Sequence, residues 1–143
     1  MTAAISAYGV ALQLGDGEVT EAFTTIAEVT DLPSPAPTLG TTDVTPHDGT
    51  GWREFIPTLL EMAEFTITVN YVPTETTHLN TDGGLLYELT QKRLSNYKIV
   101  FPDTGNTEWE FAAYVTAFTP NGPVDGGLEA QVTFRPSGSP TLA

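Results

Sequence analysis

Apolar and polar residues alternate along most of this chain of 143 residues. A period of two is typical of half-buried β-strands, because successive side chains of a strand point to opposite faces. The alternation predicts strands over the ranges 21–31, 63–72, 96–103, 107–120 and 127–136. The last two ranges flank the segment NGPVDGG, whose Asn-Gly and Asp-Gly pairs favour the positive φ of tight turns. They are expected to form a hairpin, and the fold is expected to be mainly β.

One segment follows a helical period instead. The spacing predicts an α-helix over 81–94, with Asp82 as its N-cap or first-turn acid and Lys92 and Arg93 in its last turn. Three leucines share one face of it: Leu85, Leu86 and Leu89. We therefore expect a β-sandwich or barrel of two packed sheets with one flanking α-helix. Under that helix, the predicted core consists of Phe65, Ile67, Val69, Phe111, Val115, Leu128, Val132 and Phe134.

Length and charge limit the class of protein. Residues 1–143 suit a single domain with a core of its own. Eighteen acidic residues against five basic ones leave a net charge of −13, so the surface should on average repel nucleic acid and anionic membranes. No stretch approaches the roughly 20 apolar residues that span a bilayer. The chain has no cysteine, which excludes disulfides and thiolate sites and agrees with assembly in a reducing cytoplasm.

Catalytic and metal-binding signatures are not found in the sequence. It contains no Gly-x-Ser-x-Gly elbow, no phosphate-binding glycine loop and no Cys/His pair. His47 and His78 fall in separate segments without metal-ligand spacing, and both are expected at loop surfaces. Glu108 and Glu110 share a strand face and would need a partner across a cleft to hydrolyse a glycoside. We therefore expect neither an enzyme nor a cofactor or metal site.

The segment HDGTGWREF, residues 47–55, has the composition of a docking loop. Its Arg53 is the first cation of the chain and follows seven carboxylates. Beside it lie three large apolar residues, Trp52, Phe55 and Ile56, after a glycine-rich turn. The sequence predicts a long loop over 43–61 that contacts another molecule, with these residues as its anchors. The alternative is that Trp52 packs onto its own domain. Threonine-rich strands with few lysines also favour self-association in a closed ring.

The order of these segments resembles that of a known family. It begins with SAYGVALQLGDG and EAFTTIAEVTDL and continues with DVTPHDGTGWREFIPTLLEMAEFTITVNYVP. After the helix come LSNYKIVFPDTGNTEWEFAAYVTAFTP and PVDGGLEAQVTF. In this order, the chain resembles the major tail tube proteins of long-tailed, non-contractile bacteriophages. The resemblance covers nearly the whole chain, although each piece alone is weak.

This resemblance implies a function and partners. Subunits of the family assemble into hexameric rings, and the rings stack into a tube that conducts DNA during ejection into the host. The 43–61 loop would be the family's stacking loop, which reaches a neighbouring subunit or ring. The expected location is the virion tail, assembled in the host cytoplasm. The expected partners are further copies of the chain and tape-measure, tail terminator and baseplate or tip proteins, while DNA passes through the lumen without specific binding.

The resemblance also gives the acidic composition a purpose. A tube that passes DNA benefits from a wall that repels phosphates, because each cation in the wall adds attraction. The residues expected to face the lumen are Glu28, Glu110, Glu129, Gln131 and Thr133. The alternative is that these side chains lie on a solvated exterior. Arg135 argues against uniform repulsion and would pair with a neighbour.

A second class of function is compatible with the same sequence. A β-sandwich binding module could recognise carbohydrate or protein at a virion or cell surface. Exposed aromatic residues would support it, and Trp109 and Tyr114 are the candidates. Self-association separates the two classes, because a module should remain small and bind a ligand.

Overall fold

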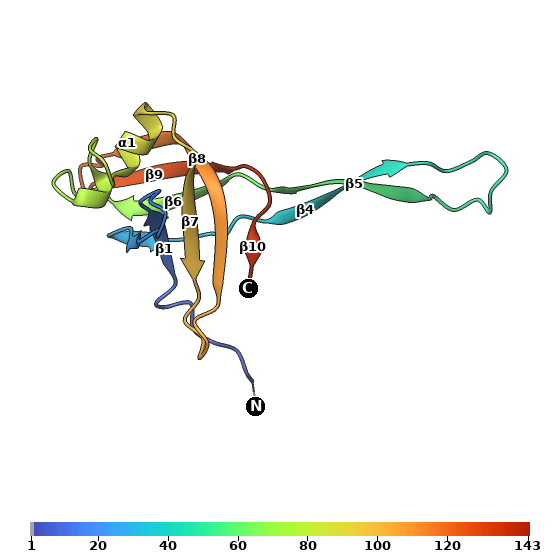
Figure 1. The fold of residues 1–143 in the computed structure, drawn as a ribbon, viewed down its shortest axis with the longest axis horizontal. Helices are drawn as coiled ribbons and strands as arrows, with labels where there is room; N and C mark the ends of the chain where they lie inside the picture. Colours follow the sequence, from blue (N-terminus) through green and yellow to red (C-terminus); the bar gives the residue numbers. More distant parts are fainter. Residues whose placement is uncertain (1) are drawn as a thin grey trace.

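The computed structural model describes residues 2–143 and contains one large curved sheet with a long hairpin projecting from it (Figure 1). The large sheet has eight strands in the order β2-β1-β7-β8-β9-β6-β3, with β10 on β8. Their bounds are Ala11–Gly15 (β1), Phe23–Thr25 (β2), Val29–Asp31 (β3), Phe65–Asn70 (β6), Ser95–Val100 (β7), Glu108–Asn121 (β8), Glu129–Pro136 (β9) and Thr141–Leu142 (β10). The hairpin is a second sheet, made of β4 (Pro37–Asp43) and β5 (Phe55–Met62). The helices are a 3₁₀ turn η1 (Thr76–His78) and α1 (Leu85–Thr90).

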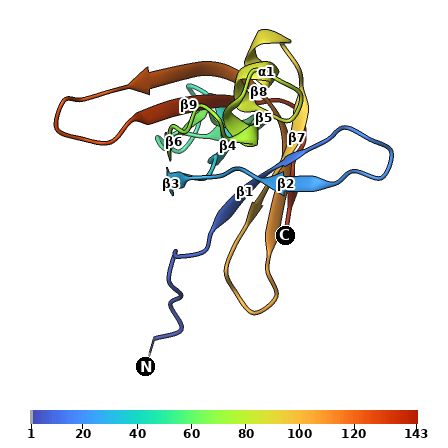
Figure 2. The ribbon, with the colours of Figure 1, turned by 90° about the vertical axis from the view of Figure 1, so that its left-hand side faces the viewer.

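The expected mainly β fold with two sheets and one helix is confirmed. The two sheets do not pack face to face as in a sandwich, because every residue of β4 is exposed and only Met62 of β5 is buried. The core lies on one face of the large sheet, which curls around it, and α1 covers an open side (Figure 2). No helix among residues 2–143 has the length and hydropathy of a membrane-spanning segment.

Seven of the eight residues that alternation placed in the core are buried. Phe65, Ile67 and Val69 of β6 face Phe134, Val132 and Ala130 of β9 in antiparallel register, and all six are buried. The rings of Phe65 and Phe134 stack at 5.0 Å. The assignment of Leu128 to the core is wrong: it precedes β9 and is 43% exposed.

The predicted single strand over 21–31 is wrong. Its two halves, β2 and β3, lie at opposite ends of the sheet order, and the chain crosses between them at residues 26–28. Ile26 points into the core with 2% of its surface exposed, and Glu28 adopts φ +64°. This crossover closes the curled sheet over its own core.

His78 fixes this crossover, and its predicted place at a loop surface is wrong because its side chain is fully buried. Its Nε2 lies 2.9 Å from the Ala27 carbonyl oxygen, while the Val72 N–H donates to Nδ1 at 3.3 Å. The Ala27 N–H donates to the Thr77 hydroxyl at 3.1 Å. The arrangement suits a neutral ring that donates from Nε2 and accepts at Nδ1. A histidine that satisfies two buried backbone groups serves the fold.

The helix is shorter than predicted, with Leu85–Thr90 in place of 81–94. Gly83 has φ +96°, and an added Cβ at Gly84 would meet the Leu79 carbonyl oxygen, so the chain turns sharply before the helix begins. Asp82 is not the N-cap: that position is Gly84, and Asp82 instead forms an ion pair of 3.1 Å with Arg93. Lys92 has φ +55°, which ends the helix early.

One turn of α1 carries a buried carboxylate. Glu88 is 2% exposed, accepts a hydrogen bond of 2.6 Å from the Ser95 hydroxyl and lies 3.7 Å from the Arg93 guanidinium. Burial raises the pKa of the Tyr97 hydroxyl well above its usual range, and the negative charge of the nearby Glu88 raises it further. These contacts tie α1 to β7 by polar as well as apolar groups.

We expect Leu85→Ala to destabilise the subunit strongly. Leu85 is fully buried in the core beneath α1, and truncating a buried leucine typically costs about 2–5 kcal/mol. Leu94→Ala is the control, because Leu94 is 49% exposed and should change the free energy of unfolding by no more than about 0.5 kcal/mol. Urea denaturation of both variants measures the difference. Equal effects would contradict the burial of Leu85.

Candidate assembly surfaces

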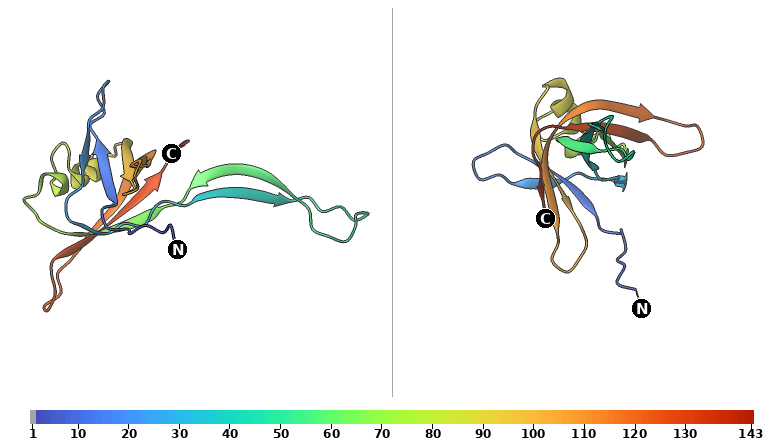
Figure 3. Two further views of the ribbon diagram at one scale, coloured as in Figure 1. Left: turned by 90° about the horizontal axis from the view of Figure 1, so that it is seen from below. Right: turned by 90° about the vertical axis from the view of Figure 1, so that its right-hand side faces the viewer.

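The hairpin β4–β5 has almost no contact with the body of the protein. We call residues 37–62 the arm: the two strands and the tip loop 44–54 between them. Residues 36–61 are all exposed, and the arm extends far from the large sheet in the left view of Figure 3. A two-stranded hairpin alone in water is marginally stable at best. An arm of this length therefore needs something to pack against.

The side chains of the arm support this conclusion. Seven large apolar residues are exposed on it: Leu39, Val44, Trp52, Phe55, Ile56, Leu59 and Leu60. Trp52 is 80% exposed, and Leu59 and Leu60 are 83% and 78% exposed. Contiguous exposed apolar groups of this kind mark protein–protein interaction sites. Because Trp52 is so exposed, the alternative that it packs onto its own domain is wrong.

The predicted loop over 43–61 is wrong in its second half. The loop covers only residues 44–54, and Phe55 and Ile56 belong to β5, where they pair with Asp43 and Thr42. Alternation did not indicate this strand, because neither of its faces is buried. A register shift between Leu39 and Thr41 also interrupts the ladder.

The tip is held by polar contacts of its own. The Arg53 guanidinium pairs with Asp43 at 3.0 Å, and the Thr45 N–H donates to the other Asp43 oxygen at 2.9 Å. The Glu54 N–H donates to the Thr45 hydroxyl at 2.8 Å, and the Val44 N–H donates to the Glu54 carbonyl at 2.9 Å. These bonds order the base of the loop and leave the Trp52 side chain outside.

The Asp43 carboxylate should make the tip sensitive to acid. The hydroxyl and the N–H of Thr45 donate to it, and together with Arg53 they lower its pKa below the usual value. A carboxyl group with a lowered folded-state pKa stabilises the folded tip above the ordinary pKa of about 3.9. That contribution is lost as the pH falls through the lower, folded-state value.

We therefore expect the Thr45 amide resonance to remain unchanged from pH 7 to about 4, near the ordinary aspartate pKa, and to shift below it. A titration followed by nuclear magnetic resonance measures this shift. Asp43→Asn is the control, because it has no carboxyl to protonate and should abolish the step. A step at or above the ordinary aspartate pKa would contradict the assigned hydrogen bonds.

Four of the five residues expected to face the lumen lie on one side of the large sheet, with Glu110 near the start of β8 and the other three on β9, which pairs with the later part of β8. Glu110 on β8 and Glu129, Gln131 and Thr133 on β9 point away from the core, since their neighbours Phe111, Ala130, Val132 and Phe134 are buried. We call the solvent side of β6, β7, β8 and β9 the polar face. Thr133 joins Thr66 on it by a hydrogen bond of 3.0 Å. Glu28 is apart from this group, in the crossover between β2 and β3.

The cations of the polar face are already paired within the subunit. Lys98 lies 3.2 Å from Glu108, and Arg135 lies 3.6 Å from Glu64. Because both cations have a carboxylate partner, their attraction for an outside anion is reduced.

The aromatic residues named for a binding module do not share a surface. Trp109 is partly buried and packs edge-on against Phe101, with ring centroids 5.6 Å apart. Tyr114 is 40% exposed on the opposite, polar face of β8. Residues 2–143 contain no group of three or more His, Asp or Glu side chains placed to hold a metal ion.

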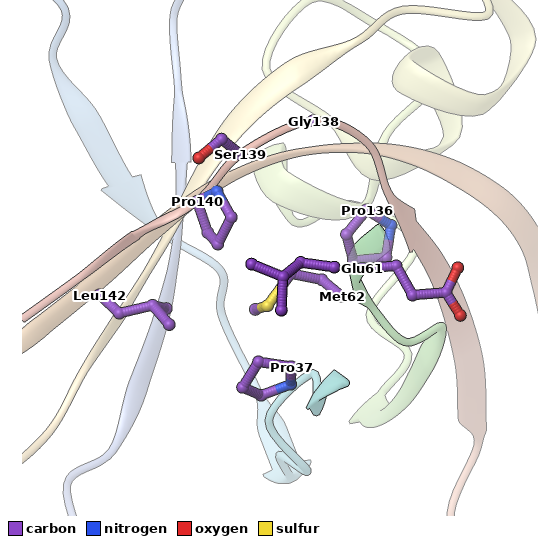
Figure 4. Close-up of a pocket in the computed structure, with 9 residues that line it drawn as sticks. Pro37, Glu61, Met62, Pro136, Gly138, Ser139, Pro140 and Leu142 are labelled. Carbon is purple, nitrogen blue, oxygen red and sulfur yellow. The ribbon is translucent and has the colours of Figure 1, made fainter. Parts of the chain in front are cut away.

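A hollow of about 450 Å³ lies where the arm leaves the body (Figure 4). Its walls come from the arm and from the C-terminal segment that includes β10. The lining is mainly apolar: Pro37, Leu60, Met62, Pro136, Pro140 and Leu142. In Figure 4, Pro37, Met62 and Pro140 point toward one another, and the Glu61 carboxylate points outward at the margin.

No protein-family model and no curated protein matches the sequence. Solved structures do match the fold. The structure is similar to a chain of the native gene transfer agent virion, with a TM-score of 0.75, 16% identity, and coverage of 98% of this chain and 99% of that one. It is similar to a chain of the anti-feeding prophage baseplate, described with six-fold symmetry, with a TM-score of 0.73, 8% identity, and coverage of 100% and 97%. It also matches the SPP1 tail tube, with a TM-score of 0.67, 10% identity, and coverage of 98% and 80%. The chain therefore has the tail tube fold.

Proposed function

We propose that this protein is a structural subunit of a phage tail tube, in which copies form rings of six that stack into a conduit for DNA ejection. The observation that carries the proposal is the arm: residues 36–61 are exposed throughout, with seven large apolar side chains among them. The shared fold supports the same conclusion. One of the similar structures is the tail of an empty gene transfer agent particle refined with C6 symmetry.

The arm is the contact between subunits in this proposal. Burying a large apolar side chain contributes about 1.5–3 kcal/mol. The apolar residues of the arm can therefore stabilise association against the mutual repulsion of subunits with a charge of −13. Trp52, Phe55 and Ile56 serve as anchors, and Arg53 supplies a cation that can meet one of the many carboxylates of a neighbour.

The polar face is the wall of the conduit in this proposal. It presents hydroxyl, amide and carboxylate groups, and Lys98 and Arg135 on it have partners of their own. Such a wall offers phosphates little attraction, so DNA can slide without being held. Six copies turn each of Glu110 and Glu129 into a ring of carboxylates at every layer.

Assembly is the property that tests this function. The purified protein is concentrated stepwise and followed by size-exclusion chromatography and negative-stain electron microscopy. Tubes or stacked rings with six-fold symmetry are the expected result. A small species at every concentration, together with specific retention on a glycan array, would instead identify a binding module.

A further inference from the structure

We propose that the hollow at the root of the arm receives the arm tip of a second copy of this chain, with Trp52 inserted and Arg53 beside Glu61. The proposal rests on the proposed function and specifies the contact through which subunits associate. It joins two features of one chain, an exposed indole and an apolar hollow, that face no partner within the subunit.

The hollow has the chemistry of a socket for an aromatic ring. Three prolines, two leucines and a methionine contribute to its lining, and their side chains offer no competing charge. Proline rings are rigid, so the socket loses little conformational freedom when it is filled. Its volume of about 450 Å³ accommodates an indole together with part of the backbone that carries it.

The tip is the segment of this chain that fits the socket best. Trp52 is the aromatic residue of the tip loop, and 80% of its surface is exposed. Tryptophan is enriched among residues that dominate binding energy when they enter such pockets. Tyr8 is also exposed, at 92%, but no Lys or Arg lies near it in the sequence.

The charges beside Trp52 and beside the hollow also favour contact between the tip and the hollow. Trp52 is followed directly by Arg53, whose side chain is 77% exposed. The socket is bordered by the Glu61 carboxylate, and the nearby cation, Arg135, is already paired with Glu64 at 3.6 Å. An apolar group beside a cation therefore meets an apolar hollow beside an anion. The intramolecular pair of Arg53 with Asp43 uses one guanidinium nitrogen, and guanidinium has five N–H donors.

The contact must join two molecules. Strands β4 and β5 separate the tip from the root, and a strand rises about 3.3 Å per residue. The seven residues of β4 therefore hold the tip on the order of 20 Å away from the chain's own socket. A head-to-tail contact of this kind is heterologous, so successive copies form a closed ring or a continuing stack.

The absence of cysteine allows a clean cross-linking test. Thr50→Cys labels the tip without altering Trp52 or Arg53, and Ser139→Cys labels the wall of the socket. The two single variants are mixed, treated with a short bis-maleimide and separated on a denaturing gel. We expect a cross-linked dimer at least about tenfold more abundant than from the control mixture of Val124→Cys with Ser139→Cys. Val124 is fully exposed at the turn between β8 and β9.

Two further variants test each half of the contact. Trp52→Ala in the Thr50→Cys background should reduce the dimer to the control level. Glu61→Arg in the Ser139→Cys background should also reduce the dimer to the control level. Adding Arg53→Glu to the Thr50→Cys partner should then restore the cross-linked dimer. The proposed contact would be refuted if the dimer yield with intact Trp52 equalled that of the control mixture. It would also be refuted if exchanging the two charges did not restore the dimer.

The result separates this contact from the proposed function. If tubes form but the cross-link does not, the proposed function stands and the contact between Trp52 and the hollow is refuted. If the cross-link forms but tubes do not, the contact stands and the proposed function as a tube subunit is refuted.

Discussion

Replacing residues 38–61 with a two-residue Asn-Gly turn should yield a folded subunit that no longer assembles. Pro37 and Met62 already lie opposite each other as paired positions, and an Asn-Gly turn is the favoured connection between paired antiparallel strands. The deleted residues are all exposed, so the core loses no buried side chain. The bond from the Ala63 N–H to the Ala36 carbonyl, 2.9 Å long, would still close the base.

The expected effect is the loss of all polymer, because every apolar anchor of the arm is removed at once. Circular dichroism and thermal melting measure the fold, and electron microscopy measures assembly over the same concentrations as for the intact chain. Thr41→Ser within the full arm is the control for a small change on β4 and should still assemble, because Thr41 is exposed and takes no part in the proposed contact. A shortened protein that forms normal tubes would show that the arm is not the assembly surface. A shortened protein that fails to fold would show that the arm belongs to the core.

Glu129→Lys should slow or stop DNA ejection while leaving the subunit folded. Glu129 is exposed at the start of β9 on the polar face, and exposed substitutions usually change stability by no more than about 0.5 kcal/mol. In a six-fold tube, the substitution places a ring of cations at every layer. Attraction between charges extends over a Debye length of roughly 8 Å at physiological salt, which is enough to act on DNA in a narrow bore.

The charge argument also predicts the salt dependence of the effect. Ejection from particles with normal tails should be slowed most at low salt and recover as salt screens the attraction. Glu18→Lys is the matched control, since Glu18 is exposed in the loop between β1 and β2 and belongs to none of the four strands of the polar face. Equal slowing by both variants would assign the effect to total charge. Unchanged ejection at low and high salt would place Glu129 outside the bore.

Local alternation was sufficient for some strands with one buried face, but it did not indicate β1, whose Leu12 and Leu14 are buried. In β6 and β9, every second residue is apolar, and the same residues are buried in the structure. The hairpin of β8 and β9 followed from its turn residues, because Asn-Gly and Asp-Gly pairs specify a reversal locally. The cation and the aromatic residue of the arm tip were found because they interrupt an acidic, polar stretch.

Elements without a buried face could not be read in this way. The strand β5 has no alternation to detect, because only Met62 of its eight residues is buried. Its pairing with β4 depends on the tertiary arrangement, which carries both strands away from the body. The short helix likewise depends on Gly84, whose close approach to the Leu79 backbone leaves no room for an earlier start.

The sequence by itself determined that this chain is mainly β, acidic and equipped with a segment for contact. The tertiary structure alone decided which groups meet. His78 is buried because the Ala27 carbonyl, 51 positions away, and the Val72 N–H require its two nitrogens. Glu110, Glu129, Gln131 and Thr133 share a face because β8 and β9 are neighbouring strands whose opposite sides pack on the core, whereas Glu28 lies outside it because the chain crosses over at that residue. Periodicity reports the face of a single strand, while contacts between distant residues depend on how the whole sheet curls.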